Sequence, residues 1–321
     1  MKKLFLILYL LSLLHIVTAF HPATMIISDP TLSKIDKIHS LVASDVNDRG
    51  MKHLVVEVPP TETDGPNGAF ALALCGVALG YKVIIATDEC NKTVFERGLV
   101  ALFHSCGHVL NGNDGCIELK AFPEESKMTS DQETELNELA KADLIIACER
   151  AGPSSDGKCY TMRGFDMNAH GLIAPLHRVV ELARSNVGAK FIGIGDGGNE
   201  LGMGKVIDAV HEHIPLGEKI GCVVEADYLV AASVSNWGAY ALAGAAAVVR
   251  ANDTDIQTSK LRDWISKCLL SEEADLHILI ECMSAGCRDG IKQEMEEPYV
   301  DGMPAERSLE CLRGIWDAVL N

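Results

Sequence analysis

Short apolar runs of the strand type alternate with stretches of the helix type along most of this 321-residue chain. The strand-type runs lie at 54–58, 83–87, 143–149, 190–195, 220–226 and 277–282. The pattern predicts helices at 68–80, 92–105, 130–142, 175–186, 203–213, 236–251, 258–269 and 305–320. Apolar strands separated by helices are typical of a parallel sheet covered on both faces. We therefore expect an α/β fold with a doubly wound, mostly parallel sheet and helices on both faces. Ser130 and Glu133 have capping-box spacing at the start of one helix.

Residues 1–19 resemble a secretory signal peptide, because Lys2 and Lys3 precede an apolar run that extends to Val17. That run is short for a membrane span, which needs about 20 apolar residues. We expect no stable membrane span. The rest of the chain has no internal repeat, low-complexity tract or clear linker, so residues 20–321 are predicted to form one domain.

The composition excludes one large class of partner. Lys and Arg number 28 and Asp and Glu number 45, so the net charge is 28 − 45 = −17. Such a chain repels phosphate backbones, and we expect no nucleic-acid partner. The eleven cysteines include several inside apolar runs and no C-x-x-C pair, which predicts mostly free thiols.

Five glycine-rich, polar segments each follow a predicted strand. They lie at 59–68, 150–160, 196–205, 227–237 and 283–290. Because ligands bind beyond the carboxyl ends of the strands in open parallel sheets, these segments are expected to gather into one site for a small molecule. Ordinary turns with solvated acidic residues are the alternative.

The segment GDGGNELGMG at 195–204 is the most informative of these. Its glycines partly fit a dinucleotide fingerprint, but Asp196 and Glu200 place carboxylates where a pyrophosphate would need amide N–H groups. A P-loop is absent. We expect Gly197 and Gly198 to bring the backbone close to a small polar ligand, with Asp196, Asn199 and Glu200 beside it. A hard cation would suit the same carboxylates.

Charged groups in the other loops suggest how an acidic substrate is held. Arg150 and Arg163 have the side-chain shape that clamps a carboxylate, although each could instead form a salt bridge. Asp64 precedes a helix and either caps it or lies in the site, where the helix start would offer free N–H groups. Asn236 is expected to orient the substrate. The alternation of His104, Cys106 and His108 could bind zinc on a strand, but a loop is the simpler expectation.

Several long motifs together resemble the D-glutamate cyclase family. They are ETDGP at 62–66, ERAG at 149–152, GIGDGGNELGMGKV at 193–206, VEAD at 224–227 and VSNWGAYAL at 234–242. The resemblance runs in order over about residues 32–320 and implies a hydro-lyase that converts D-glutamate to 5-oxo-D-proline and water. It also implies a mitochondrial location, in contrast to the signal-like N-terminus, so the compartment is left open. Only about a dozen residues separate DVNDRG (45–50) from ETDGP, where the resemblance leads us to expect a further helix and strand.

Lactam formation needs a base for the amine, a clamp for the carboxylates and relief of the negative charge that develops. We assign Asp196 or Glu200 as base or metal ligand, Arg150 or Arg163 as clamp, and Asn199 and Asn236 as orienting partners. A divalent cation such as Mg²⁺ would be held by Glu62, Asp64, Asp196 and Glu200.

Two other functions compete with the cyclase. One is a non-catalytic protein that binds acidic amino acids in the same pocket. The other is a pyridoxal-phosphate enzyme, which would need Lys158 or Lys205 as its Schiff-base lysine. The sequence does not predict the oligomeric state.

Overall fold

The computed structural model describes residues 31, 33–35, 37–38, 61–110, 117–292 and 297–321. The signal-like segment at 1–19 and the strand expected at 54–58 lie outside the described residues.

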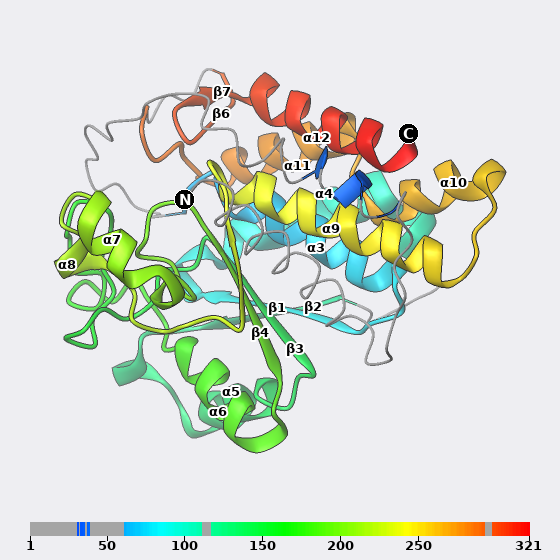
Figure 1. The fold of residues 1–321 in the computed structure, drawn as a ribbon. Coiled ribbons are helices and arrows are strands. Elements are labelled where there is room, and N and C mark those ends of the chain that lie inside the picture. The colour runs from blue at the N-terminus through cyan, green and yellow to red at the C-terminus, as the bar shows by residue number, and fades with distance from the viewer. Residues whose placement is uncertain (1–30, 32, 36, 39–60, 111–116, 293–296) are drawn as a thin grey trace.

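The strands are β1 (Val83–Asp88), β2 (Ile117–Phe122), β3 (Leu144–Cys148), β4 (Lys190–Gly195), β5 (Tyr228–Ala231), β6 (Tyr299–Val300) and β7 (Met303–Pro304). The α-helices are α3 (Pro66–Ala78), α4 (Lys92–Leu110), α5 (Ser130–Leu139), α6 (His177–Val187), α7 (Ile207–His213), α8 (Gly217–Ile220), α9 (Ser235–Asp253), α10 (Thr258–Cys268), α11 (Glu272–Ser284) and α12 (Ala305–Leu320). From α3 to α9 the described strands alternate with one or two α-helices, as an α/β fold requires, and helices α9, α10 and α11 then follow one another without a strand between them (Figure 1).

The strands form parallel ladders, which confirms the α/β class. β1 pairs with β2, and β4 pairs on its two edges with β3 and β5. β6 and β7 form a small antiparallel pair. Within the described residues β1 and β3 do not pair, so the single sheet that the sequence predicts is represented by two parallel sheets.

Helices cover both faces, as expected (Figure 1). On one face, α3 and α9 pack together and contact strands of both parallel sheets, with α4, α10, α11 and α12 stacked around them. On the other face, α5 and α6 pack Leu136 and Val179 against Phe122 of β2. Helix α9 is almost wholly buried because its run of alanine and glycine lets neighbouring helices approach closely. The carboxyl ends of the strands therefore stay free for a site.

Two predicted strands are wrong. The run at 277–282 lies inside α11, where Ala274, Ile278 and Cys282 are buried at helical spacing. Ser271 caps this helix by accepting a hydrogen bond from the Ala274 N–H, which the apolar run alone did not reveal. The run at 220–226 is mostly irregular, and the strand lies just after it at β5. Strand β2 was missed because its IELKAF sequence is mixed and only half-buried.

Two local predictions need correction. The capping box of α5 is formed by Thr129 and Gln132, one residue earlier than expected. His104, Cys106 and His108 belong to helix α4 rather than to a loop or strand. The His104 ring packs edge-on against His277, and these side chains are not among the described groups with metal-binding geometry.

The expectation of mostly free thiols is met within the described residues. The described cysteines are free thiols, and most of them are buried. None of the described helices is both long and apolar enough to cross a bilayer.

Candidate functional site

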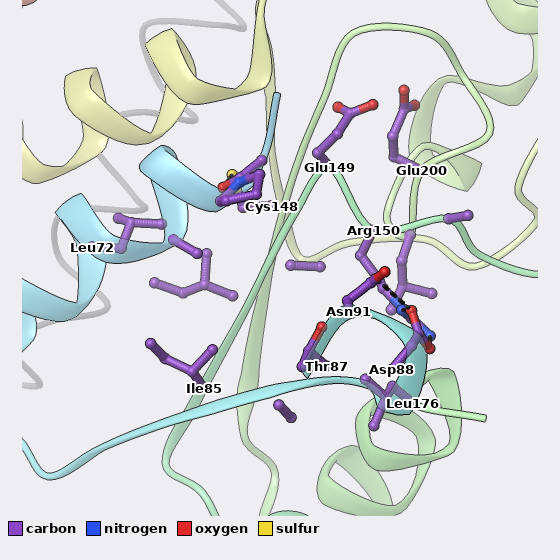
Figure 2. A pocket seen from close by; sticks show the side chains of 18 of the residues that line it. Leu72, Ile85, Thr87, Asp88, Asn91, Cys148, Glu149, Arg150, Leu176 and Glu200 are labelled. Atoms are coloured by element: carbon purple, nitrogen blue, oxygen red, sulfur yellow. Dashed lines mark hydrogen bonds and ion pairs between the residues drawn. The ribbon is translucent and has the colours of Figure 1, made fainter. Parts of the chain in front are cut away.

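A cavity of about 1060 Å³ runs along β1 and β3 and reaches the loops that follow β1, β3 and β4. One part of its wall consists of polar loops that follow these strands, and another consists of apolar side chains from α3, β1 and β3. Figure 2 shows Glu149 and Glu200 in the first part and Leu72 and Ile85 in the second. Four of the five segments predicted to meet contribute to the polar wall, which leaves 227–237 outside it.

The starts of α3 and α9 cap each other beside the polar wall. The Asp64 carboxylate accepts hydrogen bonds from the backbone N–H groups of Gly65, Ser235 and Asn236, at 2.8–2.9 Å. In return, the Asn236 side chain accepts from the N–H groups of Gly65 and Gly68 and donates to the Thr63 carbonyl. These N–H groups are therefore not free for a substrate, as the sequence suggested for the start of α3. Asp64 caps α9 rather than its own helix.

Burial raises the pKa of Asp64 to about 7, although its three backbone donors act in the opposite direction. The positive ends of two helix dipoles meet at this carboxylate. The three backbone hydrogen bonds make the ends of α3 and α9 the main partners of this carboxylate. The Asn236 side chain is fully buried and has the same structural partners.

Glu200 folds back onto its own glycine-rich loop. Its two carboxylate oxygens accept hydrogen bonds from the N–H groups of Gly197 and Gly198, at 2.7 and 2.6 Å. The side chain is only 2% exposed. The N–H groups of Gly197 and Gly198, which the sequence assigned to substrate binding, are thus occupied by Glu200.

Gly197 has no room for a side chain. A Cβ placed there would lie 2.6 Å from Sδ of Met162 and 2.9 Å from a Glu200 oxygen. The glycine therefore lets the loop after β4 meet the segment that carries Met162. The neighbouring Asn199 side chain donates to the Tyr160 carbonyl at 2.8 Å, while its buried Oδ1 has no partner among the described residues.

Among the described residues, no backbone N–H donates to the carboxylate of Glu149 or Asp196, both of which line the polar wall. Glu149 follows β3 in a left-handed conformation, with φ of 50°, and accepts a hydrogen bond from the Ser235 hydroxyl. No hydrogen bond to the Asp196 carboxylate is found within the described residues. Both side chains are half-buried, with their accessible surface facing the cavity. Strained backbone at a non-glycine residue is often found at functional sites.

The surroundings of Glu149 and Asp196 favour their uncharged forms. Burial is the main cause that raises the pKa of each well above its ordinary value, and the neighbouring carboxylates raise both further. Glu149 reaches this position because Gly65 lacks a side chain: a Cβ there would lie 2.9 Å from Cβ of Glu149.

Asp64, Glu149 and Asp196 also have the geometry of a cation site. Each offers a carboxylate oxygen, and these oxygens lie within 4.8 Å of one another. Hard cations such as Mg²⁺ prefer oxygen ligands of this kind. The set differs from the predicted one because it contains Glu149 and lacks Glu62 and Glu200.

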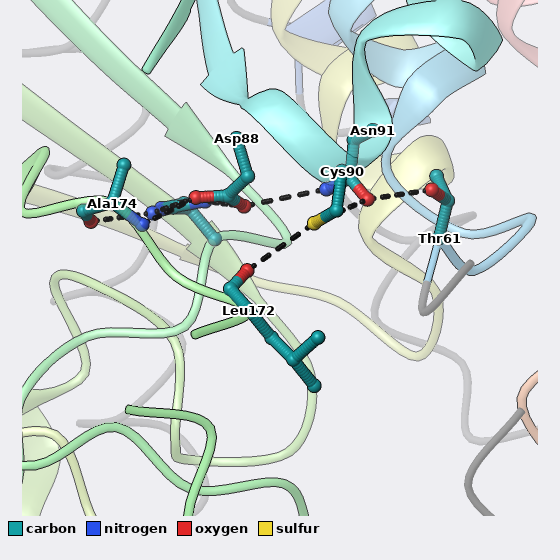
Figure 3. Close-up of polar contacts among 7 residues, drawn as sticks. Thr61, Asp88, Cys90, Asn91, Leu172 and Ala174 are labelled. Carbon is teal, nitrogen blue, oxygen red and sulfur yellow. Dashed lines mark hydrogen bonds and ion pairs between the residues drawn. The ribbon is translucent and has the colours of Figure 1, made fainter. Parts of the chain in front are cut away.

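Arg150 forms an ion pair rather than a free clamp. Its guanidinium makes two contacts with Asp88 at the end of β1 and donates to the Ala174 carbonyl at 2.9 Å. Burial alone would lower the pKa of Arg150, but the Asp88 carboxylate outweighs it and raises the pKa. Figure 3 shows Asp88 also bound by the Ala174 N–H and by Asn91, which in turn accepts from the Thr61 hydroxyl. This network fixes the end of β1.

Arg163 is the second predicted clamp, and it occupies the tip of a tight turn. The Gly164 N–H donates to the Thr161 carbonyl, and the Lys219 ammonium holds the Gly164 carbonyl from outside at 2.8 Å. Arg163 is half-buried in the cavity wall, and burial lowers its pKa although Glu62 acts in the opposite direction. No ion pair of Arg163 occurs within the described residues. Its guanidinium is therefore available to an anion.

The structure also places two lysines that the sequence offered as Schiff-base residues and two residues that the sequence analysis did not assign. Lys158 and Lys205 do not line the cavity; Lys158 pairs with Asp166 and Lys205 donates to backbone carbonyls, which removes the expected Schiff-base lysines. The sequence analysis did not assign Glu149 or Ser235 to the site, although both lie in the motifs at 149–152 and 234–242. For Glu149 the signal was its place directly after an apolar strand, which Asp196 shares.

Comparison with known proteins agrees with the motifs. Residues 54–316 match the family described as D-glutamate cyclase-like, C-terminal. The chain is 34% identical over 244 residues to the human protein named D-glutamate cyclase, mitochondrial. The aligned part covers 65% of this chain and 38% of the human protein, so the chain spans well under half of that relative's length.

Proposed function

Since the chain belongs to the D-glutamate cyclase-like family, we propose that it is a hydro-lyase that closes D-glutamate to 5-oxo-D-proline and releases water. The observation that supports this most is that some carboxyl groups at the polar wall bind backbone N–H groups whereas others face the cavity. Glu149 and Asp196 face the cavity without backbone donors to their carboxylates in the described part of the chain, and Arg163, which has no ion pair there, lines the same cavity.

The reaction joins the α-amine to the γ-carboxyl carbon and expels one oxygen as water. The ammonium loses two protons, and the departing oxygen gains them. In the reactive state Asp196 is ionised and Glu149, held by Ser235, is protonated. Asp196 accepts one proton from the ammonium, Glu149 donates one to the departing oxygen, and the second proton passes from the nitrogen to that oxygen within the tetrahedral intermediate. Arg163 holds a substrate carboxylate by a bidentate contact. Closure of a five-membered ring is intramolecular, which reduces its entropic cost and requires no ATP.

A divalent cation fits the same site. Asp64, Glu149 and Asp196 would hold it, and when bound it would polarise the γ-carboxylate of the substrate. Asp196 and Glu149 would then be ligands as well as proton carriers. Measuring turnover with added Mg²⁺ and with a chelator distinguishes catalysis that needs the cation from catalysis by the carboxyl groups alone.

A proton NMR time course tests the proposal. The purified chain is incubated with D-glutamate or L-glutamate, first with Mg²⁺ and then with excess chelator. We expect 5-oxoproline from the D-isomer alone, and none with Asp196→Asn. Asp166→Asn is the matched control, because Asp166 pairs with Lys158 outside the cavity. Loss of turnover in chelator would assign the cation.

A folded chain that binds D-glutamate by line broadening but forms no product would instead support the amino-acid binding protein. The name of the human relative suggests a mitochondrial location for this chain as well. Import of the full chain into isolated mitochondria, compared with import into microsomes, tests that location.

A further inference from the structure

Arg163 reaches the cavity from a short turn between β3 and α6, which we call the Arg163 turn (160–166). The two end residues of this turn pair as an isolated antiparallel bridge. Nearer the tip, the Gly164 N–H donates to the Thr161 carbonyl at 2.8 Å. These bonds lie within the turn, so they fix its shape but not its position against the carboxyl groups at the polar wall.

One lysine holds the tip of the Arg163 turn from outside the cavity. The Lys219 ammonium donates to the Gly164 carbonyl at 2.8 Å and lies over the Tyr160 ring, 5.0 Å from its centroid. At the base of the turn, the Asn199 side chain donates to the Tyr160 carbonyl at 2.8 Å. Lys219 is exposed and is not among the residues that line the cavity. Its effect on a substrate in the cavity therefore passes through the turn.

The packing around Gly164 is built for this contact. Gly164 has φ of +75°, and a Cβ placed there would lie 3.1 Å from Nζ of Lys219 and 3.3 Å from Cδ1 of Leu216. The backbone of Leu216 is itself left-handed, with φ of 60°. This conformation is unfavourable for a leucine and persists only where the surrounding structure holds it. The start of α8 thus grips the turn at the residue next to Arg163.

Helix α8 is also bonded to the loops that carry the carboxyl groups. The Lys219 carbonyl accepts a hydrogen bond at 2.6 Å from the hydroxyl of Ser154, in the loop after β3. Just beyond α8, the Cys222 N–H donates at 3.0 Å to the carbonyl of Gly198, in the loop after β4. These two loops present the groups assigned to proton transfer. A contact from Lys219 to the Arg163 turn therefore sets the turn against those groups.

We infer that Lys219 is a positioning residue, which holds the Arg163 turn where Arg163 can bind the substrate carboxylate while the substrate reaches Glu149 and Asp196. This inference rests on the proposed function, because it takes Arg163 as the carboxylate clamp. A binding group that is held in place in advance loses less entropy when the ligand binds. Removing the contact should therefore weaken substrate binding and leave the fold intact.

Substitutions of two lysines test this role by steady-state kinetics. Lys219→Met removes the ammonium and keeps an unbranched side chain. We expect it to raise KM for D-glutamate about fivefold and to change kcat by less than about twofold, because one hydrogen bond that orders the turn is lost. Lys219→Arg keeps a charged donor and should return KM to within about twofold of wild type. Lys205→Met is the matched control and should leave KM unchanged, because Lys205 is also exposed, donates to the Asp227 carbonyl at 2.7 Å and does not line the cavity.

A double-substitution cycle shows whether Lys219 acts through Arg163. Arg163→Gln alone raises KM, because the contact to the carboxylate is lost. In that background Lys219→Met should change KM by less than about twofold, since the contact that the turn positions is already absent. An equal rise of KM in both backgrounds would mean that Lys219 acts by another route, such as its charge, and would overturn the inference.

Hydrogen exchange gives a readout that needs no substrate. In Lys219→Met we expect the peptide that covers the Arg163 turn to exchange at least about threefold faster than in wild type, because the tip has lost its outer contact. Peptides from the buried helix α9 should exchange at the wild-type rate, which shows that the fold is intact. Wild-type exchange in the Arg163 turn would contradict the positioning role.

The outcomes separate the two proposals. Turnover of D-glutamate by wild type, with an unchanged KM in Lys219→Met, would overturn this inference and leave the cyclase standing. Binding of D-glutamate without turnover would overturn the cyclase, and the dissociation constants of the same variants would then decide the inference. Absence of both binding and turnover in the wild-type chain would overturn both proposals.

Discussion

Two pairs of carboxyl groups at the polar wall differ in what binds them. Asp64 and Glu200 accept backbone N–H groups on both of their oxygens, so they hold the ends of two helices and a glycine-rich loop in place. Glu149 and Asp196 face the cavity, and none of the described backbone N–H groups donates to their carboxylates. Each pair consists of one aspartate and one glutamate. Hydrogen-bond partners therefore indicate which acids maintain the fold and which are available for chemistry.

The two arginines repeat this contrast. Arg150 is committed to Asp88 and to the Ala174 carbonyl, whereas Arg163 sits at a turn without an ion pair among the described residues. In each comparison, replacing the side chain that is bonded to other protein groups is expected to lower the free energy of unfolding. Replacing the side chain that faces the cavity is expected to lower turnover or substrate binding.

The largest effect is expected from breaking the ion pair of Arg150. Arg150→Gln leaves the Asp88 carboxylate buried without its cation, which costs about 4 kcal/mol in the free energy of unfolding. Urea unfolding monitored by circular dichroism measures this. Arg178→Gln is the matched control, because Arg178 pairs with Glu125 and Glu133 near the surface and should cost about 1 kcal/mol or less. Equal losses in the two variants would contradict the assignment of Arg150.

Asp275 extends the comparison to a carboxyl group outside the cavity. It is 1% exposed, accepts hydrogen bonds from Tyr240 and Asn67, and burial raises its pKa to about 6. Because the folded state holds this proton more tightly than the unfolded state does, the contribution of Asp275 to stability falls as pH rises from about 4 to about 6. The difference amounts to about 3 kcal/mol. The free energies of unfolding of wild type and Asp275→Asn should converge at low pH, and at higher pH the variant should be the more stable of the two. Parallel curves would contradict the buried, protonated carboxyl.

Asp64 should act mainly through stability. Asp64→Ala removes the acceptor for three backbone N–H groups and is expected to cost about 2 kcal/mol. Asp64→Asn keeps one acceptor oxygen and should lose about half as much. Chemical unfolding compares the two. If the alanine and asparagine variants are equally stable, Asp64 does not cap α9.

Arg163 should act mainly through substrate binding. Arg163→Gln is expected to raise KM for D-glutamate about tenfold, because a charge-assisted contact to a carboxylate is lost. The unfolding free energy should change by less than about 0.5 kcal/mol, as for other substitutions outside the packed core. Steady-state kinetics and urea unfolding on one preparation give both values. An unchanged KM would remove Arg163 from the site.

Much of the fold follows from local sequence pattern. The boundaries of β4 and α12 agree with prediction because an apolar strand and an amphipathic helix carry their own periodicity. The run at 277–282 was misassigned because a short apolar stretch fits a buried helix as well as a strand. Only the burial of Ile278 and Cys282 between α11 and its neighbours decides between them.

The location of the site could be predicted, but the partners within it could not. The rule that loops follow parallel strands to one edge brought Asp64, Arg163 and Asp196 to the same cavity. Whether a carboxylate accepts a backbone N–H depends on how α9 meets the segment at 61–65. Glu149 was not assigned because its position depends on contact with Gly65, far away in sequence.

The central claim is that Glu149 and Asp196 act in turnover whereas Glu200 maintains the fold. The most direct test replaces each of these three carboxyl groups by its amide and measures turnover and thermal unfolding of each variant. Glu149→Gln and Asp196→Asn should lose at least about a hundredfold in kcat, as expected for proton-transfer groups, with unchanged or higher melting temperatures. Glu200→Gln should lower the melting temperature, because its amide N–H₂ would face the N–H groups of Gly197 or Gly198. Wild-type turnover in Glu149→Gln and Asp196→Asn, or a loss of stability in these two and not in Glu200→Gln, would contradict the account.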